Sequence, residues 1–281
     1  SAQNRVIGTT GLPTQVVIAN GGTVSSSTKT FNASSFSNRG GLFASSSAVD
    51  SNGWSGDFST AGSMSLFTDD LTLEVWYKHG GLGSSLRELM KHDTLEWLCF
   101  TKTNGTHELQ FSIVEAAGTL TLGLENAANY FTEGQWYHIV GVYEEGSSQK
   151  IYLDGKLVAS GASTSTLTGG AGNIEVLEGQ KGAIALARAW STARTGEEIR
   201  TNMFTPYADL SAGDKTDVAI SYTFNEGEGT TIVDDKGSAH SLIINNGIWA
   251  TGGTWTAGNI LSSSAGNLYI GNRAAEATVF A

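Results

Sequence analysis

Cysteine, proline and charged residues are scarce in this chain of 281 residues. It has one cysteine, Cys99, and two prolines, and charged residues make up only 15% of the sequence. A single cysteine excludes an intramolecular disulfide. Because Cys99 lies in the apolar run 97–100 with no His or Lys motif beside it, we expect a buried, unreactive thiol. The low proline content also argues against a Pro-rich disordered chain.

Basic clusters and long apolar runs are missing as well. The chain has 16 Lys and Arg against 27 Asp and Glu, a formal net charge of −11, and its basic residues are scattered. Binding to nucleic acid or to an anionic membrane surface is therefore not expected. No apolar run approaches the roughly 20 residues that span a bilayer, so we expect no membrane insertion. Residues 1–10 do not resemble a secretory leader, so either a leader was removed or none was used.

What the chain does contain predicts an all-β protein. Apolar residues make up 40% of it and glycine numbers 36, which suits many strands joined by Gly-rich turns. Residues 71–77, 109–113 and 218–224 alternate apolar and polar side chains, as half-buried strands do. Residues 134–155 predict two strands, 136–143 and 149–153, joined by the polar turn 144–148 and followed by an Asp-Gly turn at 154–155. This pattern predicts an antiparallel β-sandwich or jelly roll.

One short helix is expected, at about residues 196–203. Thr195 and Glu198 form a capping-box pair at its start, since the hydroxyl and the carboxylate can each accept a hydrogen bond from the backbone. Pro206 prevents the helix from continuing.

Four segments in order resemble the laminin-G-like, concanavalin A-like jelly-roll superfamily. They are LTLEVW at 71–76, GQWYHIVGVY at 134–143, KIYLDGKLV at 150–158 and AIALARAWSTARTGEEI at 183–199. The resemblance covers roughly residues 54–203 and implies a jelly-roll sandwich. Residues 220–249 resemble a segment that usually precedes such a domain, whereas here they follow it.

These features predict three parts of the chain. Residues 1–47 form an N-terminal arm and residues 48–205 a laminin-G-like jelly-roll domain. Residues 206–281 form a C-terminal β extension that ends in an arm. The extension either supplies permuted strands to the same sandwich or begins a partial second one.

The sequence does not predict a catalytic site. Glucanases of this fold place two carboxylates on one strand in a spacing such as E-x-D-x-E, and no such spacing occurs; the 71–77 strand supplies Glu74 alone. Lyases of this fold resemble an Arg-Glu-Leu strand plus two further motifs, of which only Arg87-Glu88-Leu89 is present. His138 has no visible catalytic partner and is interpreted as structural. The five histidines show no metal-ligand spacing.

Calcium is the one cofactor that the resemblance leaves open. It implies a Ca²⁺ ion near a loop edge in many members, and Asp57, Asp69 and Asp70 offer suitable hard oxygens. The alternative interpretation is that these acidic side chains are simply solvated turn residues.

Aromatic residues are the candidates for glycan binding, because an exposed ring can stack on a pyranose. Trp76, Trp136 and Trp190 lie in strand-like runs and are expected to fill the core. The glycan-binding candidates are Trp54, Trp97, Tyr130, Trp249 and Trp255. Packing against a neighbouring element is the alternative for each of them.

Three functions remain open. The favoured one is a non-catalytic recognition or structural module that binds a glycan or a surface protein at a cell or particle surface. The alternative is a virion decoration, cement or fibre protein, whose terminal arms would contact capsid neighbours or form a homo-oligomer. A polysaccharide hydrolase or lyase is less expected. The corresponding locations are extracellular, at the cell surface or at the virion surface.

Overall fold

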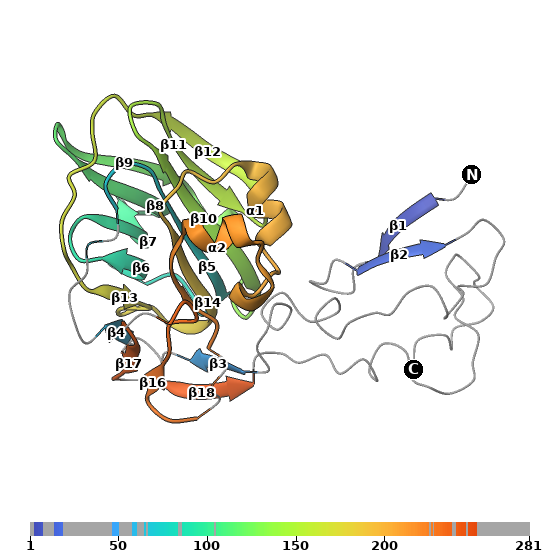
Figure 1. The fold of residues 1–281 in the computed structure, drawn as a ribbon. Coiled ribbons are helices and arrows are strands. Elements are labelled where there is room, and N and C mark those ends of the chain that lie inside the picture. Colours follow the sequence, from blue (N-terminus) through green and yellow to red (C-terminus); the bar gives the residue numbers. More distant parts are fainter. Residues whose placement is uncertain are drawn as a thin grey trace, which may run out of the picture.

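The protein is an antiparallel β-sandwich with an additional hairpin near its N-terminus (Figure 1). The computed structural model describes residues 3–7, 14–18, 47–50, 58–60, 65, 67–83, 86–103, 105–224, 226, 228–237, 240–245 and 247–251. Strands β1 (Gln3–Ile7) and β2 (Thr14–Ile18) pair with each other. The rest of the two predicted arms lies outside the described residues.

Two eight-stranded sheets form the sandwich. Sheet 1 has the order β12 (Lys156–Ala162), β11 (Ser148–Leu153), β10 (Trp136–Glu144), β5 (Leu71–His79), β14 (Gly182–Trp190), β3 (Ser47–Asp50) and β18 (Ile248–Thr251), with β15 (Val218–Tyr222) also paired to β14. Sheet 2 has the order β16 (Thr231–Ile232), β17 (Leu242–Ile244), β4 (Phe58–Thr60), β13 (Ile174–Val176), β6 (Arg87–His92), β7 (Glu96–Thr103), β8 (Thr106–Glu115) and β9 (Gly118–Leu124). The all-β, antiparallel prediction is confirmed.

The hairpin that the sequence predicted most clearly is present as β10 and β11. These strands pair from Ile139 opposite Leu153 to Glu144 opposite Ser148. The Asp-Gly turn follows, with Asp154 at φ 52° and Gly155 at φ 75°. Both angles lie in the left-handed region that this residue pair tolerates best.

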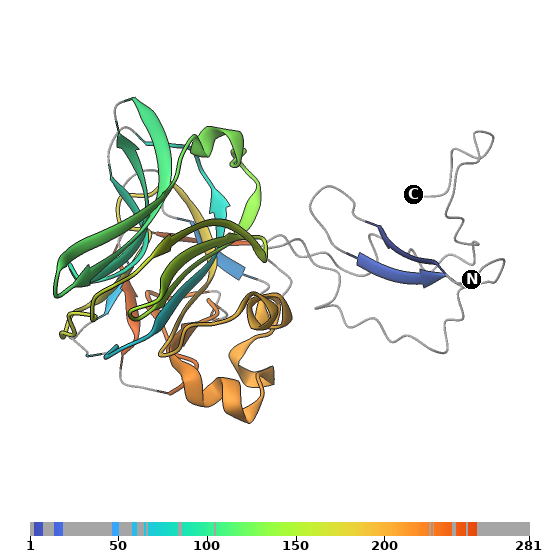
Figure 2. The same ribbon diagram turned by 90° about the horizontal axis from the view of Figure 1, so that it is seen from above.

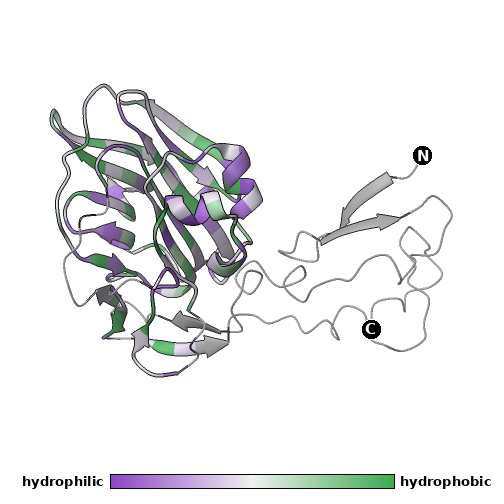
Figure 3. Cartoon of the chain, viewed as in Figure 1, coloured by the Kyte–Doolittle hydropathy of each residue, from purple (hydrophilic) through white to green (hydrophobic). Residues whose placement is uncertain are grey.

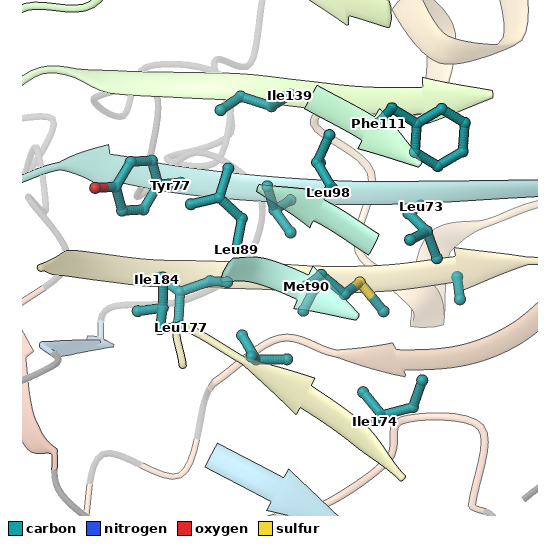
Figure 4. Close-up of a cluster of buried hydrophobic side chains, with 14 of the residues drawn as sticks. Leu73, Tyr77, Leu89, Met90, Leu98, Phe111, Ile139, Ile174, Leu177 and Ile184 are labelled. Atoms are coloured by element: carbon teal, nitrogen blue, oxygen red, sulfur yellow. The ribbon is translucent and has the colours of Figure 1, made fainter. Parts of the chain in front are cut away.

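The core lies between the two sheets. Alternate residues of each strand point inward, so Leu73 and Tyr77 of β5 meet Leu98 and Phe111 of sheet 2 (Figure 4). Along the strands, apolar residues are interleaved with polar ones (Figure 3). A Cβ atom at Gly141 would lie 2.5 Å from the Phe111 ring, so only glycine leaves room for this ring to pack against β10.

A helical segment covers the outer face of sheet 1, on the side away from β6–β9 (Figure 2). Helix α1 (Gly196–Asn202) begins at the predicted capping box. Its Ile199 packs with Val140 and Val142 of β10, and Trp76 donates its indole N–H to the Met203 carbonyl at 2.6 Å. None of the described helices has the length and apolar character needed to cross a membrane.

The prediction of a single helix was wrong. A second helix, α2 (Ala212–Asp217), follows the 3₁₀ turn η3 (Tyr207–Asp209); another 3₁₀ turn, η2 (Ala127–Asn129), follows β9. Helix α2 has no apolar stripe for periodicity to detect. It is held by Ser211, which accepts from the Asp214 backbone N–H, and by an ion pair between Asp214 and Arg194.

The strands after residue 206 pair with strands from earlier in the chain. Strand β15 pairs with β14, β17 with β4, and β18 with β3, so they belong to both sheets of the same sandwich.

Candidate functional site

The outer face of sheet 2 carries no helix among the described residues, unlike that of sheet 1. Directly paired residues of a sheet point to the same face, so the strand register shows which side chains share this one. One continuous row crosses all eight strands, in the order Thr231, Ile243, Ser59, Glu175, Lys91, Trp97, Ser112 and Thr121. The row is mostly polar, as an outward face should be.

Trp97 is the only aromatic residue on this face in the described strands of sheet 2. It is half-buried, and it projects opposite to the core residues Leu98 and Phe100. Its neighbours Cys99 and Ser112 are small and have no solvent exposure. Ser112 also shares a 2.9 Å hydrogen bond with Thr121. A sugar ring could stack on the indole here, whereas the Ser112 hydroxyl beside it is buried and already paired with Thr121.

Beside Trp97 lies a group of three carboxylates and one ammonium, formed by Glu88, Lys91, Glu175 and Glu178. Oxygen atoms of the three carboxylates lie within 4.8 Å of one another. Lys91 Nζ lies 2.9 Å from Glu88 and 2.5 Å from Glu175, and it also contacts Glu178. We call these four residues the carboxylate–lysine cluster. Its ammonium occupies the position where the carboxylates would otherwise hold a cation.

The carboxyl groups of this cluster differ in acidity because they differ in burial and in their hydrogen bonds. Burial and a hydrogen bond to Glu178 raise the pKa of Glu88 to about 7. The hydrogen bond from Glu88 lowers the pKa of Glu178 to about 2. Burial also raises the pKa of Glu175. Of the three carboxyl groups, Glu178 is therefore the strongest acid.

A second polar group is buried under the helical segment on sheet 1. Glu74, which is 3% exposed, accepts hydrogen bonds from Arg188 Nε and Nη2, both at 2.9 Å, and from Trp190 Nε1 at 2.8 Å. His138 Nε2 lies 2.7 Å from the same carboxylate. Burial alone would raise the pKa of Glu74, but Arg188 and His138 hold that pKa well below its usual range. The sequence suggested no partner for His138; the structure supplies one from another strand.

This buried group is structural rather than reactive. Arg188 and His138 have no solvent exposure, and Arg188 also donates to the carbonyls of Asn202 and Thr205. It thereby fastens the helical segment to sheet 1. Glu74 itself is 3% exposed and bound by three other side chains, so it is not placed to reach a glycosidic bond.

The three predicted aromatic candidates among the described residues, Trp97, Tyr130 and Trp249, lie on different elements. Tyr130 ends η2 and is 44% exposed, whereas Trp249 of β18 packs partly against the core and donates its indole N–H to the Gly229 carbonyl at 2.7 Å. Trp54 and Trp255 lie outside the described residues. As predicted, Trp76, Trp136 and Trp190 are buried, at 4% exposure or less.

The calcium candidates do not form a group in the described residues. Asp70 accepts a hydrogen bond from the Glu145 backbone N–H at 2.9 Å and thereby holds the β10–β11 turn. Asp69 is exposed and accepts a hydrogen bond from Thr68. Asp57 lies outside the described residues.

The carboxylate–lysine cluster was not predicted from the sequence. The glucanase pattern places its acids on one strand, whereas here Glu88 comes from β6, and Glu175 and Glu178 come from β13 and the turn after it. Only the pairing of β6 with β13 brings them together. Cys99, in contrast, is buried as predicted, and burial raises the pKa of its thiol to about 12.

Comparison with known proteins now identifies the family. A family model described as the concanavalin A-like lectin/glucanases superfamily matches residues 50–200, more than half of the chain. The chain belongs to this superfamily. No curated protein sequence matches it.

One solved structure shows a similar fold at low sequence identity, and two others match more loosely. A candidate carbohydrate-binding protein from Bacteroides ovatus superposes with a TM-score of 0.54 and 17% identity, over 73% of this chain and 60% of that one. A heptameric SAP-like pentraxin from Limulus polyphemus gives 0.46 and 13%, over 71% and 94%. The ligand-binding domain of botulinum neurotoxin serotype D, solved with N-acetylneuraminic acid, gives 0.38 and 12%, over 53% and 42%. This chain thus covers about 60% of the length of the Bacteroides ovatus protein.

Proposed function

We propose that this chain is a carbohydrate-recognition module without a catalytic role. The observation that carries the proposal is the outer face of sheet 2, where the Trp97 indole lies in a polar row that crosses the whole sheet. Flat polar surfaces with one aromatic ring suit saccharides, which present C–H groups to the ring and hydroxyls to its neighbours. The carbohydrate-binding description of the Bacteroides ovatus relative supports the same function.

The arrangement of the acids supports binding rather than cleavage. Retaining glycosidases hold two carboxyl groups about 5 Å apart with the glycosidic bond between them. The carboxylates of Glu88, Glu175 and Glu178 are about that close, but Lys91 Nζ contacts all three. A substrate bond therefore has no room between these carboxylates.

A glycan microarray with the purified chain tests this function. We expect binding to at least one saccharide class, and Trp97→Ala should weaken it about tenfold, because truncating a central aromatic anchor typically costs more than 1 kcal/mol. The array should include calcium and chelator arms, since the calcium prediction is still open.

Chromatography of the bound saccharides after long incubation tests the non-catalytic part. Unchanged chain length is the expected result. Release of shorter products by the wild type but not by Glu88→Gln would show an enzyme instead. A glycan-binding role would also place the protein at a cell or particle surface, which fractionation of the source cells can test.

A further inference from the structure

The outer face of sheet 2 is strongly acidic. Its described strands and the β13 turn carry four carboxyl groups, those of Glu88, Glu108, Glu175 and Glu178, against the ammonium of Lys91 and the guanidinium of Arg87, which reaches Gly179 of the same turn. Glu178 is the most accessible carboxylate of the cluster, with its side chain 44% exposed, and Glu175 is 22% exposed. A ligand on Trp97 would therefore approach through a negative potential.

The cluster itself shows which chemical group suits these carboxylates. They converge on a primary ammonium, Lys91 Nζ, and the three carboxyl groups outnumber the two cationic side chains beside them, Lys91 and Arg87. A further cation beside the cluster would gain Coulomb energy, whereas an additional carboxylate or sulfate would be repelled. Lys91 and Glu175 stand in the same cross-strand row as Trp97, with Lys91 directly opposite it. Glu175 lies two strands from Trp97, roughly 10 Å away with Lys91 between them, so a ring on Trp97 and an amine at Glu175 would belong to neighbouring sugar residues.

We propose that this face binds a saccharide chain bearing free amino groups, with a sugar ring on Trp97 and an amine beside Glu175 and Glu178, and that it rejects acidic saccharides. The inference rests on the proposed function and specifies its ligand class. The aromatic ring distinguishes a saccharide from a basic peptide, which would need only the charges. The indole would stack on any sugar ring, while the carboxylates would attract amino groups and repel acidic groups. The specificity would come from both together.

Calorimetric titration with three matched oligosaccharides tests the proposal. The first is a glucosamine oligomer, the second its fully N-acetylated counterpart, and the third a uronic acid oligomer of equal length. We expect the amine-bearing oligomer to bind about three- to tenfold more tightly than the N-acetylated one at low ionic strength, since each exposed charge pair contributes modestly. The difference should shrink in concentrated salt. The acidic oligomer should bind most weakly.

Two sets of variants separate the ring from the charges. Trp97→Ala should weaken binding of all saccharides, and Trp97→Phe should restore part of it. The double variant Glu175→Gln, Glu178→Gln should abolish the preference for amines while retaining binding of the N-acetylated oligomer. The matched charge control is Glu197→Gln with Asp209→Asn, which removes two exposed acids from the helical segment over sheet 1. Thermal unfolding verifies that each variant is folded.

Each outcome bears on a different part of the argument. If no saccharide binds, the proposed function fails. If saccharides bind but Trp97→Ala and the double Gln variant leave affinity and preference unchanged, the function stands and this inference is overturned. If oligolysine binds as tightly as the glucosamine oligomer and Trp97→Ala does not affect either, the face attracts any polycation and the saccharide proposal is wrong.

Discussion

Replacing Glu74 with Gln should destabilise the sandwich by about 3 kcal/mol, because it leaves the buried Arg188 guanidinium without its counter-charge. Arg188 has no solvent exposure and both of its contacts with Glu74 are 2.9 Å long. Removing one partner of a buried ion pair costs roughly 3–5 kcal/mol. Gln keeps the shape and one acceptor oxygen, so the lower end of this range applies.

Urea unfolding at neutral pH measures the loss, and a double-mutant cycle with Arg188→Met isolates the pair. Because Met removes the unpaired charge, the double variant should be more stable than the sum of the single losses predicts, with a coupling energy of about 2 kcal/mol. A loss below about 1 kcal/mol for Glu74→Gln, or additive single effects, would refute the reasoning.

The pH dependence of the same variant provides a further check. Arg188 and His138 depress the pKa of Glu74 in the folded state. A depressed carboxyl pKa stabilises the fold at all pH values above the pKa of the unfolded chain, and this stabilisation is lost as the pH falls toward the folded pKa. The advantage of the wild type over Glu74→Gln should therefore be constant from pH 8 to about pH 5 and decrease only in stronger acid.

Three further predictions concern packing, acid stability and helix capping. Gly141→Ala should cost about 1–3 kcal/mol in urea unfolding, because the new methyl group meets the Phe111 ring; equal stability would show that this ring can move. Burial lowers the pKa of His79 to about 4, so the neutral form stabilises the fold above the ordinary pKa and this contribution is lost between about pH 6.5 and pH 4. His79→Gln should make the free energy of unfolding depend less on pH between these two values. If the variant and the wild type lose stability in parallel there, His79 is not the responsible group. Thr195→Ala removes the hydroxyl that accepts from the Glu198 N–H and should lower stability by about 1 kcal/mol, while Thr195→Ser should not.

Local features of the fold could be predicted from the sequence. The β10–β11 hairpin and the Asp154–Gly155 turn depend on residues within about twenty positions of one another, and the capping box of Thr195 and Glu198 on residues three apart. These signals lie within short stretches of sequence, so they can be recognised without the tertiary structure. Helix α2 was missed because it has no apolar stripe. Its Ser211 cap is local, but its ion-pair partner Arg194 lies 20 residues from Asp214.

The candidate site was less accessible to sequence reasoning. The run 97–100 is apolar at every position, so its periodicity does not tell which side chains face the core. Only the pairing with β6 and β8 shows that Trp97 and Cys99 point outward and Leu98 and Phe100 inward. The site proposals depend on this assignment.

The sequence by itself determined that this chain forms an antiparallel sandwich with a recognisable hairpin, a capped helix and no acid pair in the E-x-D-x-E spacing of the glucanases. Only the tertiary structure decided that Glu74 is locked by Arg188, 114 residues later, and that Glu88, Glu175 and Glu178 converge on Lys91 beside Trp97. The physical reason is that the two-residue period of a strand is set by local backbone geometry. Which strands pair, and in what register, depends on burying both sheets together.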